Sequence, residues 1–137
     1  MRKRTQSREF ALQILYQADV THENAKEVCK DFWDTVEIGQ KENEVKEYAE
    51  KLVQGALSKQ AELDKIIEAS AENWSVGRMA LVDRNILRLA AYEILHLDEI
   101  PDKVAINEAV ELAKRFGESD SSKFVNGILD KIAKTKP

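Results

Sequence analysis

Residues 79–97 are the part of the sequence that most constrains the fold. The stretch reads MALVDRNILRLAAYEILHL and contains no glycine or proline. On a helix of about 100° per residue, its apolar side chains cover an arc of roughly 200°. An apolar surface this wide predicts a central helix that packs against several neighbours. Asp83 and Glu93 point into the apolar arc, so each is expected either to have a partner within the fold or to face another molecule.

Apolar side chains recur at helical spacing along most of the chain, and no alternation typical of β-strands is sustained. Helices are expected at about residues 7–20, 24–38, 43–59, 62–70, 79–97 and 102–116, with a last helix that begins between residues 119 and 122. Only five glycines and two prolines interrupt the chain. The sequence therefore predicts an all-α protein of about seven helices.

The second of these helices has recognisable end signals. Asn24 and Glu27 have the spacing of a capping box at its start. Gly39 is the expected C-terminal cap, because glycine adopts the left-handed conformation in which many helices end.

Length and cysteine content limit the class of protein. The chain has 137 residues, which suits one domain or two small ones. Cys29 is the only cysteine, so no internal disulfide can form, and a reducing, cytoplasmic setting is the simplest interpretation. No stretch is apolar enough to span a membrane, and the N-terminus does not read as a signal peptide.

The net charge of −4 conceals a basic start. Residues 1–18 contain four basic residues and one acid, whereas residues 19–72 contain twice as many acidic as basic residues. Arg4 and Arg8 are four residues apart, so they share one face of the first helix if that helix begins early. A basic arm on an acidic body predicts local contact with phosphates rather than general nucleic-acid binding. The alternative is a solvated N-terminus that is basic by chance.

No catalytic constellation is present in the sequence. Nothing in the sequence links His22, His96 and Cys29 as a metal site or as a cysteine–histidine pair. No glycine-rich phosphate loop follows a strand. We therefore expect no enzyme, no metal site and no cofactor.

Two residues in unusual positions carry separate predictions. Trp74 lies in a short connection before the central stretch and is expected to anchor that joint rather than to serve as a platform for a ligand. Gly127 lies inside the last helix, where it costs about 1 kcal/mol relative to alanine. Its presence there indicates that another helix or a ligand approaches the backbone closely.

Three blocks of sequence resemble the NusB family of transcription antitermination factors. They are REFALQILY at residues 8–16; WS at 74–75 with LVDRNILRLAAYE at 81–93; and a third block that runs from IP at 100–101 through VAINEAVELAK at 104–114 to KFVNGILD at 123–130. The KFVNG run, a short distance after INEAVELAK, is the most specific of these signals. Together the blocks span nearly the whole chain.

The resemblance implies a single NusB-like RNA-binding domain over residues 1–137, built from two three-helix subdomains (about 1–72 and 73–137) that share a long central helix. It implies binding of single-stranded boxA RNA as a heterodimer with NusE, a protein of the small ribosomal subunit. It also implies a role with RNA polymerase in processive transcription of ribosomal RNA operons. Whether the free protein forms a homodimer stays open.

The resemblance also assigns site residues. Those for RNA are Arg4, Arg8, Asp120, Ser121, Lys123, Phe124 and Asn126. Cations and the amides at a helix start suit phosphates, whereas a carboxylate accepts from base amino groups. Those for NusE are Tyr16 and Asp83. Phe124 could instead belong to the core, and Asp83 could be a first-turn carboxylate stabilised by the helix dipole.

Two other functions compete with this one. The first is a helical adaptor that binds only protein. The second is a stand-alone relative of the NusB-like domain of ribosomal RNA methyltransferases, which is disfavoured because the sequence stops at Pro137. The basic start is short and the C-terminal tail has few cations, so RNA binding without NusE is expected to be weak.

Overall fold

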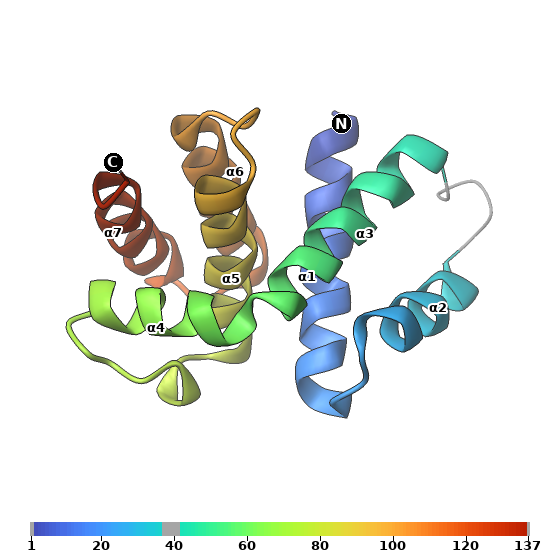
Figure 1. Ribbon diagram of the computed structural model, residues 1–137, viewed down its shortest axis with the longest axis horizontal. Helices are drawn as coiled ribbons and strands as arrows, with labels where there is room; N and C mark the ends of the chain where they lie inside the picture. The colour runs from blue at the N-terminus through green and yellow to red at the C-terminus, as the bar shows by residue number, and fades with distance from the viewer. Residues whose placement is uncertain (1, 37–41, 137) are drawn as a thin grey trace. The chain divides into compact units, whose positions relative to one another are not determined.

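The computed structural model describes residues 2–36 and 42–136, and these are helical almost throughout (Figure 1). Gly39, the expected cap, lies outside the described residues. The helices are α1 (Lys3–Thr21), α2 (Ala25–Thr35), α3 (Asn43–Ser58), α4 (Gln60–Ser70), the short 3₁₀ helix η2 (Val76–Arg78), α5 (Leu81–His96), α6 (Asp102–Phe116) and α7 (Ser121–Lys134). No strand occurs in these ranges, so the prediction of an all-α fold with seven α-helices is confirmed.

The helices form two compact units, Met1–Ser58 and Lys59–Pro137. The boundary falls earlier than the expected one near residue 72. The reason is that α4 packs against α5 and α7, so it belongs with the helices that follow it. The second unit therefore holds four helices rather than three.

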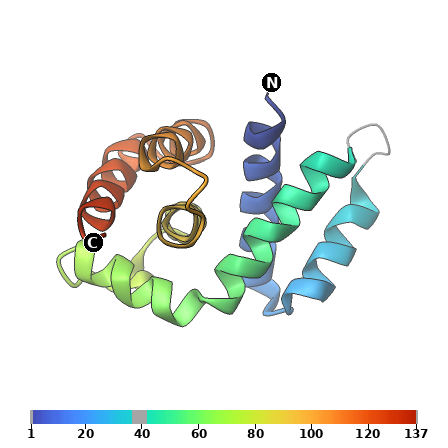
Figure 2. The ribbon, with the colours of Figure 1, turned by 45° about the horizontal axis from the view of Figure 1, so that its top comes forward.

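In the first unit, α1 packs against both α3 and α2, and Figure 2 shows α3 crossing α1. Phe10, Phe32 and Trp33 meet edge to face, with ring centroids 5.1–5.8 Å apart. The capping box of α2 is confirmed, because the Asn24 side chain accepts from the Glu27 amide at 2.9 Å and the Glu27 carboxylate accepts from the Asn24 amide at 3.3 Å.

In the second unit, α5 is the central helix. Figure 2 views it nearly along its axis, with α4, α6 and α7 around it. The apolar face predicted for residues 79–97 is buried, with Ile86, Leu87, Ala90 and Ile94 fully inaccessible to solvent. Glu93 is also fully buried, as expected for an acid in the apolar arc.

The opposite, polar side of α5 is partly buried: Asn85 and Arg88 are buried, whereas Arg84, Tyr92 and His96 are half-buried. Arg88 donates two hydrogen bonds to the carboxylate of Asp64 on α4, at 2.8 and 3.0 Å, and a third to the Asn85 side chain at 3.2 Å. Asn85 in turn donates to the carbonyl of Leu81 at 2.8 Å. This bidentate pairing satisfies the hydrogen bonding of the Arg88 guanidinium and the Asp64 carboxylate. The two side chains can therefore pack between α5 and α4 without an unpaired charge.

Candidate nucleic-acid interface

The first turns of α1 hold the basic residues predicted to contact RNA. Arg4 is exposed, and its guanidinium carbon lies 3.9 Å from the centroid of the Tyr48 ring on α3. Arg8 is only 3 % exposed, and its guanidinium carbon lies 5.8 Å from the same ring. Cations are attracted to aromatic faces at such distances, so Tyr48 orients Arg4 at the surface. Arg8 does not present its charge to solvent.

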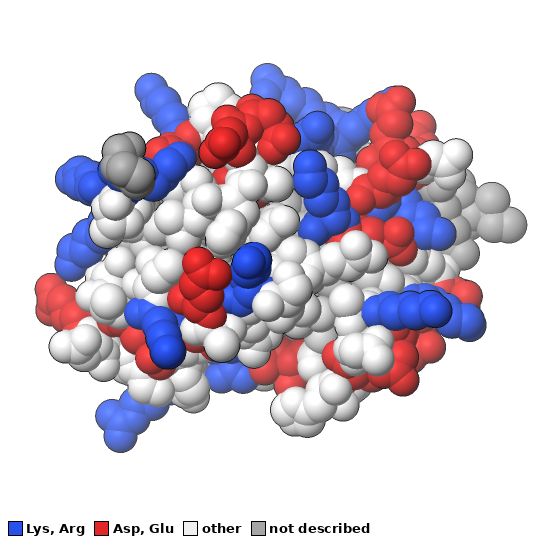
Figure 3. Space-filling view, in the orientation of Figure 1, with Lys and Arg blue, Asp and Glu red and all other residues white. Residues whose placement is uncertain are grey.

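A hollow of about 370 Å³ opens beside Arg4, between α1 and α3. Its lining residues are Lys3, Arg4, Ser7, Glu44, Glu47, Tyr48 and Lys51. Lys3 pairs with Glu44 at 3.2 Å, and this hydrogen bond raises the pKa of the Lys3 ammonium. The hollow therefore mixes cations with carboxylates, and the face drawn in Figure 3 likewise has both signs interspersed. Charge alone does not mark one surface for nucleic acid.

The start of α7 holds the second predicted group. Asp120, Lys123 and Asn126 are exposed, whereas Ser121 is 3 % exposed. The Ser121 hydroxyl accepts a hydrogen bond from the Glu118 amide at 2.9 Å, which closes the turn between α6 and α7. Ser121 is thus occupied within the fold, while its three neighbours are available to a ligand.

Gly117 makes this turn possible. A Cβ at Gly117 would lie 2.6 Å from the Cβ and Oγ of Ser121 and 2.8 Å from the carbonyl oxygen of Ala113. Real side chains do not approach this closely, so only glycine fits the end of α6 without a shift of its neighbours.

Phe124 is half-buried and meets the Trp74 ring edge to face, with centroids 5.3 Å apart and planes at 71°. Trp74 itself is 47 % exposed. The prediction that it anchors the joint is therefore only partly right, because the ring packs on Phe124 while about half of the residue remains exposed.

Gly127 lies on the exposed side of α7, one turn after Phe124. A Cβ built there meets no atom of the described chain within 4 Å. The expectation that a neighbouring helix needs this glycine is wrong for the described chain, because nothing there packs against it. Of the two explanations that the sequence suggested for Gly127, close approach of a ligand remains.

The residues predicted to bind a protein partner have different surroundings. Tyr16 on α1 is 40 % exposed, and Val20, one turn later, is 56 % exposed. Asp83 is half-buried in the first turn of α5, and its Oδ1 is buried with no hydrogen-bond partner in the described part of the chain. An unpaired buried carboxylate oxygen is costly, and a donor from another molecule would relieve that cost.

Sequence reasoning missed three contributors to these surfaces. Val20 could have been found from its position four residues after Tyr16, which places both on one helical face. Tyr48 had no local signal, because its role depends on α3 packing beside α1. The exposure of Trp74 depends on the path of the connection after α4, which periodicity does not describe.

In the ranges that the structure describes, no group of three or more His, Cys, Asp or Glu residues could hold a metal ion. None of the described helices is long and apolar enough to cross a membrane. The described residues thus form two all-helical units with exposed cations beside aromatic rings, which suits a helical binding protein with nucleic-acid or protein partners.

Comparison with known proteins identifies the family. The NusB family model matches residues 5–134, and the chain belongs to the NusB family. The transcription antitermination protein NusB of Anaeromyxobacter sp. (strain Fw109-5) is 50 % identical over 135 residues, which cover 98 % of this chain and 92 % of the relative. The family predicted from the three sequence blocks is confirmed.

Two solved structures agree with this assignment. T. maritima NusB is 37 % identical and has a TM-score of 0.85, covering 96 % of this chain and 90 % of that one. A structure of the antitermination factors NusB and NusE in complex with dsRNA is 33 % identical with a TM-score of 0.86, covering 99 % of both chains.

Proposed function

We propose that this chain is a transcription antitermination factor that binds RNA together with NusE, and that the RNA is the boxA element of ribosomal RNA operons. The observation that carries this proposal is the likeness, over nearly the whole chain, to NusB antitermination proteins and to the NusB of a NusB–NusE–dsRNA complex. The protein acts by binding, without catalysis, within the antitermination complex of RNA polymerase. A role in bacterial transcription would place it in the cytoplasm.

The RNA-binding residues divide by exposure. Arg4 and Lys123 are exposed and supply the phosphate contacts, while Asp120 and Asn126 reach base edges. Arg8 and Ser121, predicted from the same resemblance, are buried. In this proposal Ser121 shapes the start of α7, and Arg8 reaches RNA only if its side chain moves.

Each unit contributes its own residues to NusE binding: Tyr16 and Val20 in the first unit, and Asp83 in the second. The first two contribute an exposed apolar face of α1, and Asp83 contributes an acceptor whose Oδ1 has no hydrogen bond in the described chain. An aromatic ring beside an aliphatic side chain is the kind of anchor on which protein interfaces depend. A donor from NusE would complete the hydrogen bonding of Asp83 once its buried Oδ1 turns toward the surface.

Titration of a fluorescently labelled boxA RNA, with and without NusE, tests the proposal. We expect weak binding by the chain alone, tighter binding with NusE, and little binding of a scrambled RNA of equal length. Absence of saturable, sequence-selective binding in both conditions would refute the RNA assignment and leave an adaptor that binds only protein.

The phosphate contacts are tested by the salt dependence of the same titration. Arg4→Ala and Lys123→Ala are each expected to weaken binding and to lower the slope of log K against log salt by about 0.7, the value per phosphate for single-stranded nucleic acid. Lys103→Ala, which removes an exposed cation from α6, is the matched control and should leave the slope unchanged. An unchanged slope for Arg4→Ala would exclude Arg4 as a phosphate contact.

A further inference from the structure

Hydrogen bonds hold the loop between α4 and η2 in a defined conformation. Glu72 and Asn73 both have left-handed backbones, with φ of 54° and 66°. The amide of Asn73 donates to the Glu68 carbonyl at 2.8 Å, and the amide of Val76 donates to the Glu68 carboxylate at 2.7 Å. Asparagine adopts the left-handed region readily, but for Glu72 that backbone costs energy, so these bonds hold Glu72 in an unfavourable conformation.

This loop conformation leaves Trp74 exposed at the surface. Its amide donates to the Ala71 carbonyl at 3.0 Å, and the edge-to-face contact with Phe124 fixes its ring. Yet 47 % of the residue remains exposed, although tryptophan is usually among the more buried residues. The ring is thus held in place without being covered.

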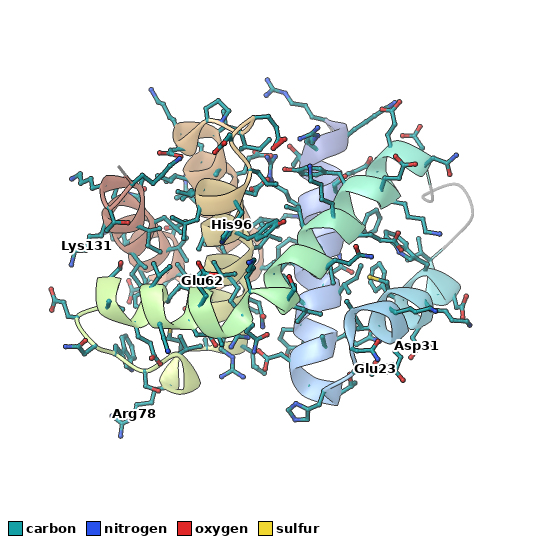
Figure 4. The ribbon with its side chains drawn as sticks, viewed as in Figure 1. Glu23, Asp31, Glu62, Arg78, His96 and Lys131 are labelled. Carbon is teal, nitrogen blue, oxygen red and sulfur yellow. The ribbon has the colours of Figure 1, made fainter. Side chains whose placement is uncertain are left out.

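Charged residues lie close to both members of this ring pair along the chain. On α7, Lys123 precedes Phe124, and Lys131 lies two turns further along the same side, with its Nζ 3.6 Å from a carboxylate oxygen of Glu72 in the loop. Arg78 extends from η2, as Figure 4 shows. An aromatic surface bordered by flexible cations suits single-stranded nucleic acid, in which each base has a flat face and each link carries a negative charge.

We propose that Trp74 is a stacking platform for an unpaired RNA base, with Phe124 packed against the indole ring. The base stacks on the exposed part of the indole, while Lys123 and Arg78 neutralise neighbouring phosphates. This inference rests on the proposed function, since it extends the RNA surface of residues 120–126 to the loop before η2. It adds a residue that sequence reasoning had assigned to the joint.

The fluorescence of the native protein gives a direct test. The chain has two tryptophans, of which Trp33 is 4 % exposed and Trp74 is 47 % exposed, so the fraction quenched by iodide reports Trp74. With NusE present, saturating boxA RNA is expected to quench this emission and to protect it from iodide. NusE alone is expected to do neither.

Two variants test the contribution of the ring. Trp74→Leu, which keeps an apolar contact for Phe124, is expected to weaken RNA binding about 5- to 150-fold, because stacking on an aromatic ring contributes about 1–3 kcal/mol per base. Its salt slope should equal that of the native protein, since no phosphate contact is removed. Trp74→Phe should recover most of the affinity. Phe116→Leu, which alters another exposed aromatic residue on α6, is the matched control.

Each outcome has a defined meaning. If the native protein with NusE fails to bind RNA, the proposed function fails and this inference with it. If the native protein binds RNA but Trp74→Leu binds equally well, or the iodide-sensitive emission does not change, only the inference is overturned. Quenching by NusE without RNA would assign Trp74 to the protein partner and would also overturn it.

Discussion

Replacing Gly127 by alanine is expected to stabilise the protein and, at the same time, to weaken its binding of RNA. Gly127 lies in the interior of α7, is exposed, and has open space where a Cβ would stand. Alanine is favoured over glycine inside a helix by about 0.5–1 kcal/mol. Since no described atom obstructs the new methyl group, that full gain should be realised.

The expected size of the effect follows from the size of the unfolding unit. A gain of 1 kcal/mol corresponds to a rise in Tm of about 3 °C if the whole chain unfolds together, and of about 6 °C if Lys59–Pro137 unfolds by itself. Gly117→Ala is the matched control. Its Cβ would meet backbone and side-chain atoms at 2.6–2.8 Å, so it should lose about 1–3 kcal/mol.

Urea unfolding followed by circular dichroism, together with the RNA titration, measures both effects. A lower free energy of unfolding for Gly127→Ala would contradict the conclusion that a Cβ at this position meets no obstruction. The loss of RNA affinity tests whether RNA approaches the bare backbone between Phe124 and Lys131. An unchanged affinity in a stabilised variant would remove Gly127 from the RNA surface.

Three further predictions concern single side chains. Arg88→Ala should lower the free energy of unfolding by about 3 kcal/mol, the lower end for a broken buried pair, because the Asp64 side chain keeps 23 % exposure; an unchanged urea midpoint would refute this. Asp83→Lys should abolish NusE binding in a pull-down while the helical circular dichroism persists, and loss of helicity would instead make Asp83 structural. Burial raises the pKa of the Cys29 thiol from 9.0 to about 11. As the pH rises, the thiol therefore ionises in the unfolded protein before it ionises in the folded protein. The free energy of unfolding should fall by up to about 2–3 kcal/mol between pH 9 and 11. Cys29→Ala should lack that component, and an identical pH profile for both proteins would contradict it.

Local patterns predicted the elements well. The wide apolar arc of residues 79–97 anticipated a helix surrounded by neighbours, and α5 is that helix. The capping box at Asn24 needed only two residues three positions apart. α1 begins at Lys3, before the expected start at residue 7, because the basic turn that precedes the apolar stripe carries no periodic signal.

Local sequence patterns could not identify the partner residue, on another helix, with which each side chain makes contact. The buried state of Arg88 depends on Asp64, which lies on another helix and gives no local sign of the pairing. Arg8 and Arg4 share one face by spacing, yet one is buried and the other exposed. Burial is a property of the packed unit, so a helical pattern alone ranks both arginines as equal.

The division of the chain also has a consequence for how the protein is made. Each unit is one continuous piece of sequence, and the first is complete at Ser58. Helical units that depend on local contacts fold quickly, and domains generally fold in the order in which they are synthesised. Residues 1–58 have all their helices once they leave the ribosome, so this unit can acquire its core while α4 to α7 are still being translated.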